Sequence, residues 1–109
     1  MISSDIIRGH LDAIILRLII EKDRYGYEIS KEISMRTDNQ FGIKEATLYA
    51  VFQRLEKKEL IESYKGEQTH GGVRKYYTVT TLGKAYYSEK VKEWQTTKKV
   101  IDTFMEGLK

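Results

Sequence analysis

Two groups of side chains in this sequence have the types and the spacing to contact a polyanion. The first group is mostly polar and lies between residues 44 and 54: Lys44, Glu45, Thr47, Tyr49, Gln53 and Arg54. The second group is basic and consists of Lys65, Arg74 and Lys75. Lysine and arginine hold phosphate oxygens, whereas polar side chains on a helix can hydrogen-bond to the exposed edges of bases. The chemistry that these two groups favour is recognition of double-stranded DNA.

The net charge of the chain favours the same chemistry, because it is concentrated in one segment. The formal net charge is +3. Residues 63–90 hold five basic and two acidic residues, whereas the segments on either side are close to neutral. A local excess of this kind is typical of an anion-binding surface. A solvated surface of mixed charge can show the same fluctuation, so the charge distribution alone leaves both interpretations open.

Hydrophobic periodicity predicts three helices ahead of the hairpin described next. Apolar residues spaced three to four apart predict the first helix over about residues 5–20 and the second over about residues 27–35, after Gly26. The third helix is expected over about residues 45–58, and its buried face carries Leu48, Val51, Phe52 and Leu55. The other side of this third helix is then shared by Thr47, Ala50, Gln53, Arg54 and Lys57.

A β-hairpin is predicted to follow. Residues 60–65 and 73–79 are rich in β-branched and aromatic side chains, which favours strands, and the glycine-bearing stretch 66–72 between them favours a turn. The hairpin carries the whole basic group. Tyr76 and Tyr77 are neighbours on its second strand, so they point to opposite faces. We expect one of them to be buried and the other to lie near the DNA backbone.

A long last helix is predicted over about residues 81–106, with Thr80 as its N-cap. Its apolar residues follow a heptad-like spacing: Tyr87, Val91, Trp94, Ile101, Met105 and Leu108, with Lys98 at one polar position. A heptad stripe normally packs against a second helix. A chain of 109 residues buries only a modest core, so help from a second subunit is expected.

The order of these elements predicts a mainly α-helical fold with a small β-hairpin, a winged helix-turn-helix. We expect a DNA-binding domain over residues 1–80 and a dimerisation helix over residues 81–109, which together form one compact unit. The major groove of B-DNA, about 12 Å wide, admits one helix, and the third helix has the required polar face. The hairpin can then meet phosphates, which set the register and supply affinity.

The sequence lacks the residues that a metal site, an enzyme active site or a membrane-spanning segment would need. There is no cysteine, and neither His10 nor His70 has a second ligand at metal-binding spacing, so no metal or other cofactor is expected. The sequence has no nucleophile motif with its acid and base and no phosphate-binding glycine loop, so an enzyme is not expected. No apolar run is long enough to span a membrane, and the first residues lack the basic flank of a secretion signal. We therefore expect a cytoplasmic protein without a membrane partner.

Three motifs resemble a known family. They occur in order at the start of the second helix, in the third helix and in the hairpin: Tyr25-Gly26-Tyr27-Glu28-Ile29, Glu45-Ala46-Thr47-Leu48-Tyr49 with Arg54-Leu55-Glu56, and Gly72-Val73-Arg74-Lys75-Tyr76-Tyr77 with Thr80 and Gly83. Together with Leu60-Ile61 they resemble the signature of PadR-family transcriptional regulators, over roughly residues 5–105.

The resemblance implies a homodimeric repressor that binds DNA and dimerises through its last helix. It also implies small aromatic or hydrophobic effectors, often phenolic acids or flat drugs. The short chain with a single last helix is similar to the smaller subfamily that includes the lactococcal multidrug-resistance regulator. By this resemblance Trp94, with Lys98 one turn beyond it, is expected to line a ligand site at the dimer interface. The alternative for Trp94 is ordinary packing in the interface core.

The sequence departs from the family pattern at three lysines. Lys44 precedes the third helix where the family usually has a capping serine or asparagine, so the cap is lost and a cation lies near the groove. Lys65 stands in the hairpin where the drug regulator has a second tryptophan. Lys98 brings a cation that favours neutral or anionic aromatic ligands over cationic ones.

Two alternatives to an effector-controlled repressor stay open at this point. A winged helix can serve protein contacts without DNA, and a DNA-binding regulator can act without a small-molecule effector. A dimer on a twofold-symmetric operator requires its two reading helices to lie about 34–36 Å apart, one turn of the duplex.

Overall fold

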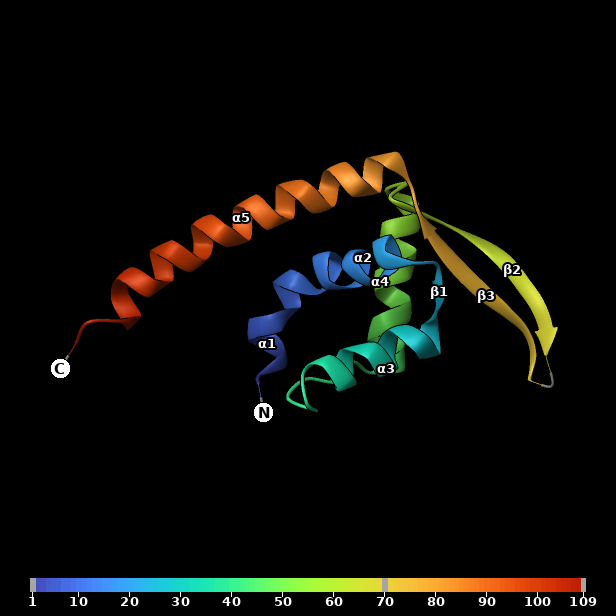
Figure 1. Ribbon diagram of the computed structural model, residues 1–109, viewed down its shortest axis with the longest axis horizontal. Coiled ribbons are helices and arrows are strands. Elements are labelled where there is room, and N and C mark those ends of the chain that lie inside the picture. The colour runs from blue at the N-terminus through green and yellow to red at the C-terminus, as the bar shows by residue number, and fades with distance from the viewer. Residues whose placement is uncertain (1, 70, 109) are drawn as a thin grey trace.

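The N-terminal half of the chain forms the helices that build the core (Figure 1). The computed structural model describes residues 2–69 and 71–108. A short helix α1 (Ser4–Ile7) and a 3₁₀ turn η1 (Arg8–His10) lead into α2 (Leu11–Glu21). The expectation of one continuous helix over residues 5–20 is therefore wrong in detail. The interruption contains Gly9, the weakest helix former of the segment, and α1 turns away from α2.

The next two helices confirm the predicted ones. They are α3 (Gly26–Arg36) and α4 (Glu45–Lys57), and α4 runs across α2 and α3 in Figure 1. At the end of α4, Glu59 has left-handed backbone (φ 62), and the amide of Leu60 donates to the carbonyl of Leu55 at 2.9 Å. This closure ends the helix and turns the chain directly into the first long strand.

A three-stranded antiparallel sheet follows the order β1-β3-β2. The long strands β2 (Ile61–Thr69) and β3 (Gly72–Val79) form the predicted hairpin, which we call the wing. The short strand β1 (Arg24–Tyr25) pairs with β3 and was not predicted, because two residues are too few to show an alternating pattern.

The wing is longer than the sequence predicts. Instead of a turn over residues 66–72, β2 continues to Thr69, with a break in regular pairing between Lys65 and Gln68. Gly66 lies at this break, and a Cβ atom added to it would stand 2.5 Å from the ring of Tyr76. The glycine thus marks a place where two strands pass closely rather than the start of a turn. His70, which the sequence places in the turn, lies outside the described residues.

The core lies between α2, α3, α4 and the sheet. Its fully buried side chains come from all four: Ile15, Leu16, Ile19, Ile29, Val51, Phe52, Leu55 and Ile61. The ring of Phe52 stacks on that of Tyr77, with centroids 4.0 Å apart. These contacts confirm the predicted inner face of α4 and identify Tyr77 as the buried member of the tyrosine pair.

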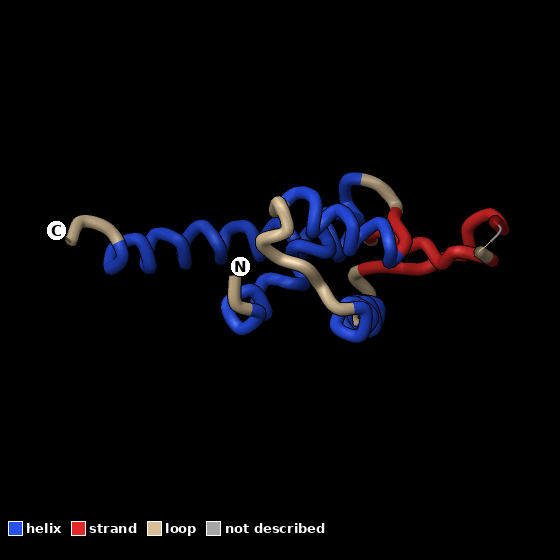
Figure 2. The backbone as a smooth tube through the Cα atoms, turned by 90° about the horizontal axis from the view of Figure 1, so that it is seen from below, coloured by secondary structure: helices blue, strands red, loops and turns tan. Residues whose placement is uncertain are grey.

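The last helix, α5 (Thr81–Met105), begins where the sequence predicts. The hydroxyl of Thr80 accepts a hydrogen bond from the amide of Gly83 at 3.0 Å and lies 3.0 Å from the carbonyl oxygen of Leu60, to which it can donate. The first part of α5 packs along α2, and the rest extends beyond the body of the molecule in both Figure 1 and Figure 2. The molecule is accordingly elongated, with extents of 58 × 29 × 20 Å.

The extension carries apolar side chains into solvent. Tyr87 and Val91, nearer the start of α5, are partly buried, whereas Ile101, Phe104 and Met105 are exposed, Phe104 to 79%. Within one chain, only the first part of the heptad stripe has a partner.

Replacement of Gly83 by alanine should destabilise the fold. An added Cβ would lie 2.1 Å from the carbonyl oxygen of Leu60, so α5 must move away from β2. We expect a loss of about 1–3 kcal/mol in the free energy of unfolding, the usual cost of overpacking, measured by urea titration. Gly9→Ala is the control, because its methyl group meets no atom within 4 Å. An unchanged midpoint for Gly83→Ala would show that this contact is not kept in solution.

Candidate nucleic-acid interface

The exposed side of α4 forms a narrow stripe of two alanines and two polar side chains. Leu48, Val51, Phe52 and Leu55 are buried, so the side chains directly opposite them point outward. These are Ala46, Ala50, Gln53 and Lys57, all exposed and spaced four, three and four apart. Thr47 is also exposed, at the edge of this stripe. The two alanine side chains are short, so the backbone of α4 could approach a DNA groove closely.

The position of α4 in the molecule makes this stripe accessible. Figure 2 views α4 nearly along its axis, at the end of the loop that follows α3, and shows it at one side of the molecule. The sequence predicts this side of the helix for Thr47, Ala50, Gln53 and Lys57, and it predicts DNA contacts for Thr47 and Gln53 among them. Ala46 was not predicted on this side, although it lies four residues before Ala50.

The start of α4 lies beside the start of α3. Lys44 is the N-cap and makes no side-chain capping bond within the described structure, as its departure from the family pattern predicts. A cavity of about 280 Å³ between the two helix starts is lined by Glu45 and Tyr49 from α4 and by Tyr27 and Ser30 from α3. Tyr27, whose side chain is 65% exposed, was not predicted from the sequence as a contact residue.

Arg54 lies at the edge of the exposed stripe, but its side chain already has a partner within the fold. Its guanidinium group forms an ion pair with the carboxylate of Asp12 on α2, and its Nε lies 3.3 Å from Oδ2. The hydrogen bond from this guanidinium to Asp12 raises the pKa of Arg54. The side chain therefore reaches toward α2, although Arg54 lies on the same side of α4 as Thr47, seven residues earlier.

The wing separates the basic group onto two faces. Lys65 and Lys75 are direct partners across the hairpin, so they share one face. This is the face toward α4, since the Nζ of Lys75 lies 3.9 Å from Glu56 and 5.5 Å from the ring centre of Tyr77. Like charges directly opposite each other are unfavourable in a sheet, and a bound anion would relieve their repulsion.

Arg74 lies on the other face of the wing, among tyrosines. Its guanidinium stacks on the ring of Tyr25, 4.5 Å from the centroid. Tyr76 lies between Tyr25 and Tyr64, at 5.4 and 5.8 Å, so the half-buried member of the predicted tyrosine pair belongs to this row. The hydroxyl of Tyr64 donates to Asp23 at 2.6 Å, which raises the pKa of Tyr64. This row of tyrosines was not predicted from the sequence, because Tyr25 belongs to the short strand β1, which shows no sequence pattern.

A larger cavity, of about 580 Å³, lies between α5 and the helices α2 and α3. Trp94 lines it together with Tyr87 and Val91, and the ring of His10 meets the Trp94 ring edge-on at 5.1 Å. Lys98 is not among the lining residues and instead donates to Asp102 at 2.8 Å. Of the two predicted ligand-binding residues, the structure places Trp94 at a cavity and Lys98 away from it.

The described residues contain neither a metal-binding cluster nor a membrane-spanning helix. Residues 2–69 and 71–108 contain no cluster of three side chains suited to a metal ion. Over the same ranges, no helix has the length and apolar character needed to cross a bilayer.

Comparison with known proteins assigns the arrangement to a family. The model of the PadR-like family of transcriptional regulators matches residues 15–89, from α2 to the first part of α5. An uncharacterised protein from Lysinibacillus sphaericus is 74% identical over 108 residues, which is 99% of each chain.

Solved structures agree in fold. A transcriptional regulator from Clostridium thermocellum is 54% identical, with a TM-score of 0.89 over 94% of this chain and 100% of that one. A PadR family transcription regulator from Clostridium difficile is 42% identical, with a TM-score of 0.76 over 89% of this chain and 99% of that one.

The family match confirms three expectations from the sequence. The fold is a winged helix-turn-helix, the function is regulation of transcription through DNA, and the chain is not an enzyme, since PadR family members are regulators. This chain belongs to the PadR-like family of transcriptional regulators.

Proposed function

We propose that this protein is a homodimeric, sequence-specific repressor of transcription in the cytoplasm. It reads a twofold-symmetric operator with α4 and the wing. A small aromatic or hydrophobic effector that binds at the dimer interface releases the protein from this operator. The observation that carries the DNA contact is the position of the wing beside α4. Lys65 and Lys75 share one face of the wing, and Lys75 contacts Glu56 of α4, the residue before Lys57 of the outer stripe.

In this proposal α4 enters the major groove and reads bases. Gln53 lies at the centre of the stripe, and a glutamine can form two hydrogen bonds with an adenine edge. Thr47 at the stripe's edge offers a hydroxyl and a methyl group for further base contacts. Lys44 and Tyr49 lie near the start of α4 and Tyr27 near the start of α3, so these side chains meet the flanking backbone.

Phosphate contacts come from the wing. Lys65 and Lys75 present two cations side by side toward the same strand of DNA, which supplies affinity without sequence preference. Arg74 can reach phosphates only from the opposite face of the hairpin, where it is stacked on Tyr25. We therefore assign the main phosphate contact to the two lysines and a smaller one to Arg74, and Arg54 serves chiefly to hold α4 to α2 through Asp12.

Dimerisation is proposed for the exposed part of α5. Soluble monomers seldom leave a contiguous apolar face in water, and a second copy provides the matching heptad stripe. The residues expected in the interface are Tyr87, Val91, Trp94, Ile101, Met105 and Leu108, and the structure adds Phe104. Closed twofold pairing also brings the two α4 helices into a fixed spacing, as a palindromic operator requires.

The effector is proposed to bind where Trp94 meets the larger cavity. A flat aromatic molecule stacked on this ring gains about 0.5–1.5 kcal/mol beyond burial for each aromatic pair. Such a ligand releases DNA only if it binds the DNA-incompetent form of the dimer more tightly than the competent one. The alternative role for Trp94 is packing in the interface core without a ligand.

Removal of one wing lysine should weaken DNA binding for all sequences alike. We expect Lys75→Ala or Lys65→Ala to make the negative slope of log affinity against log salt shallower by about one unit, measured by fluorescence anisotropy. Gln53→Ala should instead change the preferred sequence. Lys84→Ala is the control, since Lys84 belongs to the same basic segment but lies on α5. Unchanged slopes for both wing variants would favour a winged helix used for protein contacts.

Charges placed on the extension of α5 should separate the dimer. Ile101→Glu combined with Met105→Glu buries two carboxylates in the proposed interface, which is strongly unfavourable. We expect wild type to sediment as a dimer at micromolar concentration and the double variant as a monomer. Lys99→Glu, an exposed position beside the stripe, should remain dimeric. Single chains for the wild type, with or without DNA, would contradict the proposal.

Aromatic compounds that act as effectors should quench the fluorescence of the protein. Trp94 is the only tryptophan, so its emission reports directly on the proposed site. We expect saturable quenching by a subset of flat aromatic molecules and weaker operator binding in their presence. If a broad panel changes neither the emission nor the operator affinity, the protein regulates transcription without such an effector.

A further inference from the structure

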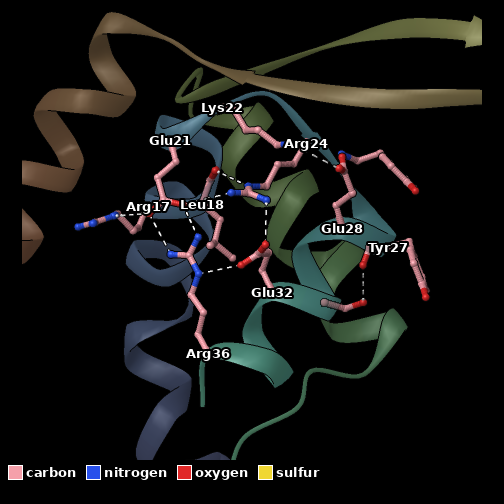
Figure 3. Close-up of polar contacts among 11 residues, drawn as sticks. Arg17, Leu18, Glu21, Lys22, Arg24, Tyr27, Glu28, Glu32 and Arg36 are labelled. Carbon is pink, nitrogen blue, oxygen red and sulfur yellow. Dashed lines mark hydrogen bonds and ion pairs between the residues drawn. The ribbon is translucent and has the colours of Figure 1, made fainter. Parts of the chain in front are cut away.

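A cluster of arginine and glutamate side chains joins the ends of α2 and α3 (Figure 3). Glu21, the last residue of α2, is its centre. Its carboxylate accepts two hydrogen bonds from Arg36 of α3, at 2.6 and 2.9 Å. It also accepts from Nε of Arg17 at 2.9 Å and from Nη2 of Arg24 at 3.1 Å. One carboxylate therefore receives bonds from α2, β1 and α3.

Arg24 and Glu32 close this cluster into a ring. Arg24 is buried, its Nε donates to the carbonyl of Leu18 at 2.8 Å, and its Nη1 lies 3.5 Å from Glu32. Glu32 also accepts from Nε of Arg36 at 2.8 Å. Because the groups share partners, a movement of α3 relative to α2 breaks several charge-assisted bonds at once.

The cluster stays ionised at neutral pH. Hydrogen bonds from Arg36 and Arg17 lower the pKa of Glu21 to about 2. Its ion pairs are thus fully formed above the ordinary carboxyl range and are lost only as the pH falls toward 2. The cluster acts as a permanent connection rather than as a pH-sensitive one.

Arg17 extends the connection to α5. Its Nη1 donates to the hydroxyl of Tyr87 at 3.3 Å, while its Nε holds Glu21. A continuous path of side chains, Tyr87 to Arg17 to Glu21 to Arg36, therefore runs from α5 to α3. Tyr87 lines the same cavity as Trp94, two turns further along α5.

Helix α3 in turn supports the start of α4. Gly26, the first residue of α3, lies against α4 so closely that an added Cβ would stand 3.4 Å from the hydroxyl oxygen of Tyr49 and 3.6 Å from Leu48. A rigid shift of α3 is passed on to these residues, because packed helices move as units.

We propose that Glu21 and Tyr87 are positioning residues that couple α5 to the DNA-reading helix. Glu21 holds Arg17 and Arg36 together, so the position of α5 fixes that of α3 and, through it, that of α4. The inference rests on the proposed function, in which α4 reads DNA and α5 forms the interface. If the cluster served stability alone, its loss would lower the unfolding free energy but leave the α3–α5 distance and the DNA affinity of the folded protein unchanged.

Energy transfer from Trp94 to a dye on α3 tests the coupling without DNA. The chain has one tryptophan and no cysteine, so Met35→Cys, at an exposed position of α3, provides a single labelling site. We expect Glu21→Gln and Tyr87→Phe to shift or broaden the distance distribution obtained from time-resolved decays. Glu89→Gln removes a carboxylate from an exposed pair with Lys92 on α5 and should leave the distribution unchanged.

The unlabelled variants are then tested on a duplex selected by the wild-type protein from random sequences. We expect Glu21→Gln and Tyr87→Phe each to reduce affinity about fivefold, the lower end of coupling between separate sites. The double variant should lose no more than the larger single effect, because both changes interrupt one path.

Three outcomes overturn the coupling: unchanged distances in the folded variants, wild-type affinity in both variants, or fully additive losses in the double variant. Tyr87→Phe removes a single oxygen and keeps the ring, so it decides the question even if Glu21→Gln fails to fold. If the distances change as expected while wild type binds no duplex, the connection between α5 and α3 stands and the proposed DNA-reading function fails.

Discussion

The stacking of Phe52 on Tyr77 is the contact on which the proposed DNA-reading surface depends. Both rings are buried with centroids 4.0 Å apart, and such a pair adds about 0.5–1.5 kcal/mol to the burial of the two side chains. It attaches the inner side of α4 to the central strand of the sheet. The outer side of α4, with Gln53, is then exposed, and Lys75 comes to lie beside the helix. One apolar contact thus sets the relative position of both elements that are proposed to meet DNA.

Arginine and lysine have different tasks in this chain. Arg17, Arg24 and Arg36 bind carboxylates at the junction of α2, β1 and α3, where the planar guanidinium group can hold two oxygens at once. The lysines at positions 65 and 75 lie at the wing, where a compact ammonium group can meet phosphate as a point charge in the proposed DNA contact. The local excess of positive charge in residues 63–90 therefore marks the wing, although the arginines that hold the helices together lie outside that segment.

Helix α5 connects the two ends of the proposed mechanism. Its extension exposes apolar side chains that a second copy can cover, and its first part contacts α2 through Tyr87 and Arg17. Trp94 lies between these parts and lines the larger cavity. A change at the interface and a change in the reading helices are thus joined through one rigid element rather than through a flexible linker.

The sequence by itself determined the elements and their faces: the inner residues of α4, the cap at Thr80, the hairpin and the stripe on α5 all follow from local periods of 3.6 and 2. The tertiary structure decided the partners. Arg54 pairs with Asp12, which is 42 residues away, and β1 joins the sheet although two residues carry no pattern. Likewise, alternation separates Arg74 from Lys75, but only packing against α4 decides which of them faces the reading helix. Local backbone geometry depends on neighbouring residues in the sequence, so the sequence predicts it. The choice among distant partners depends on which surfaces the whole fold brings together.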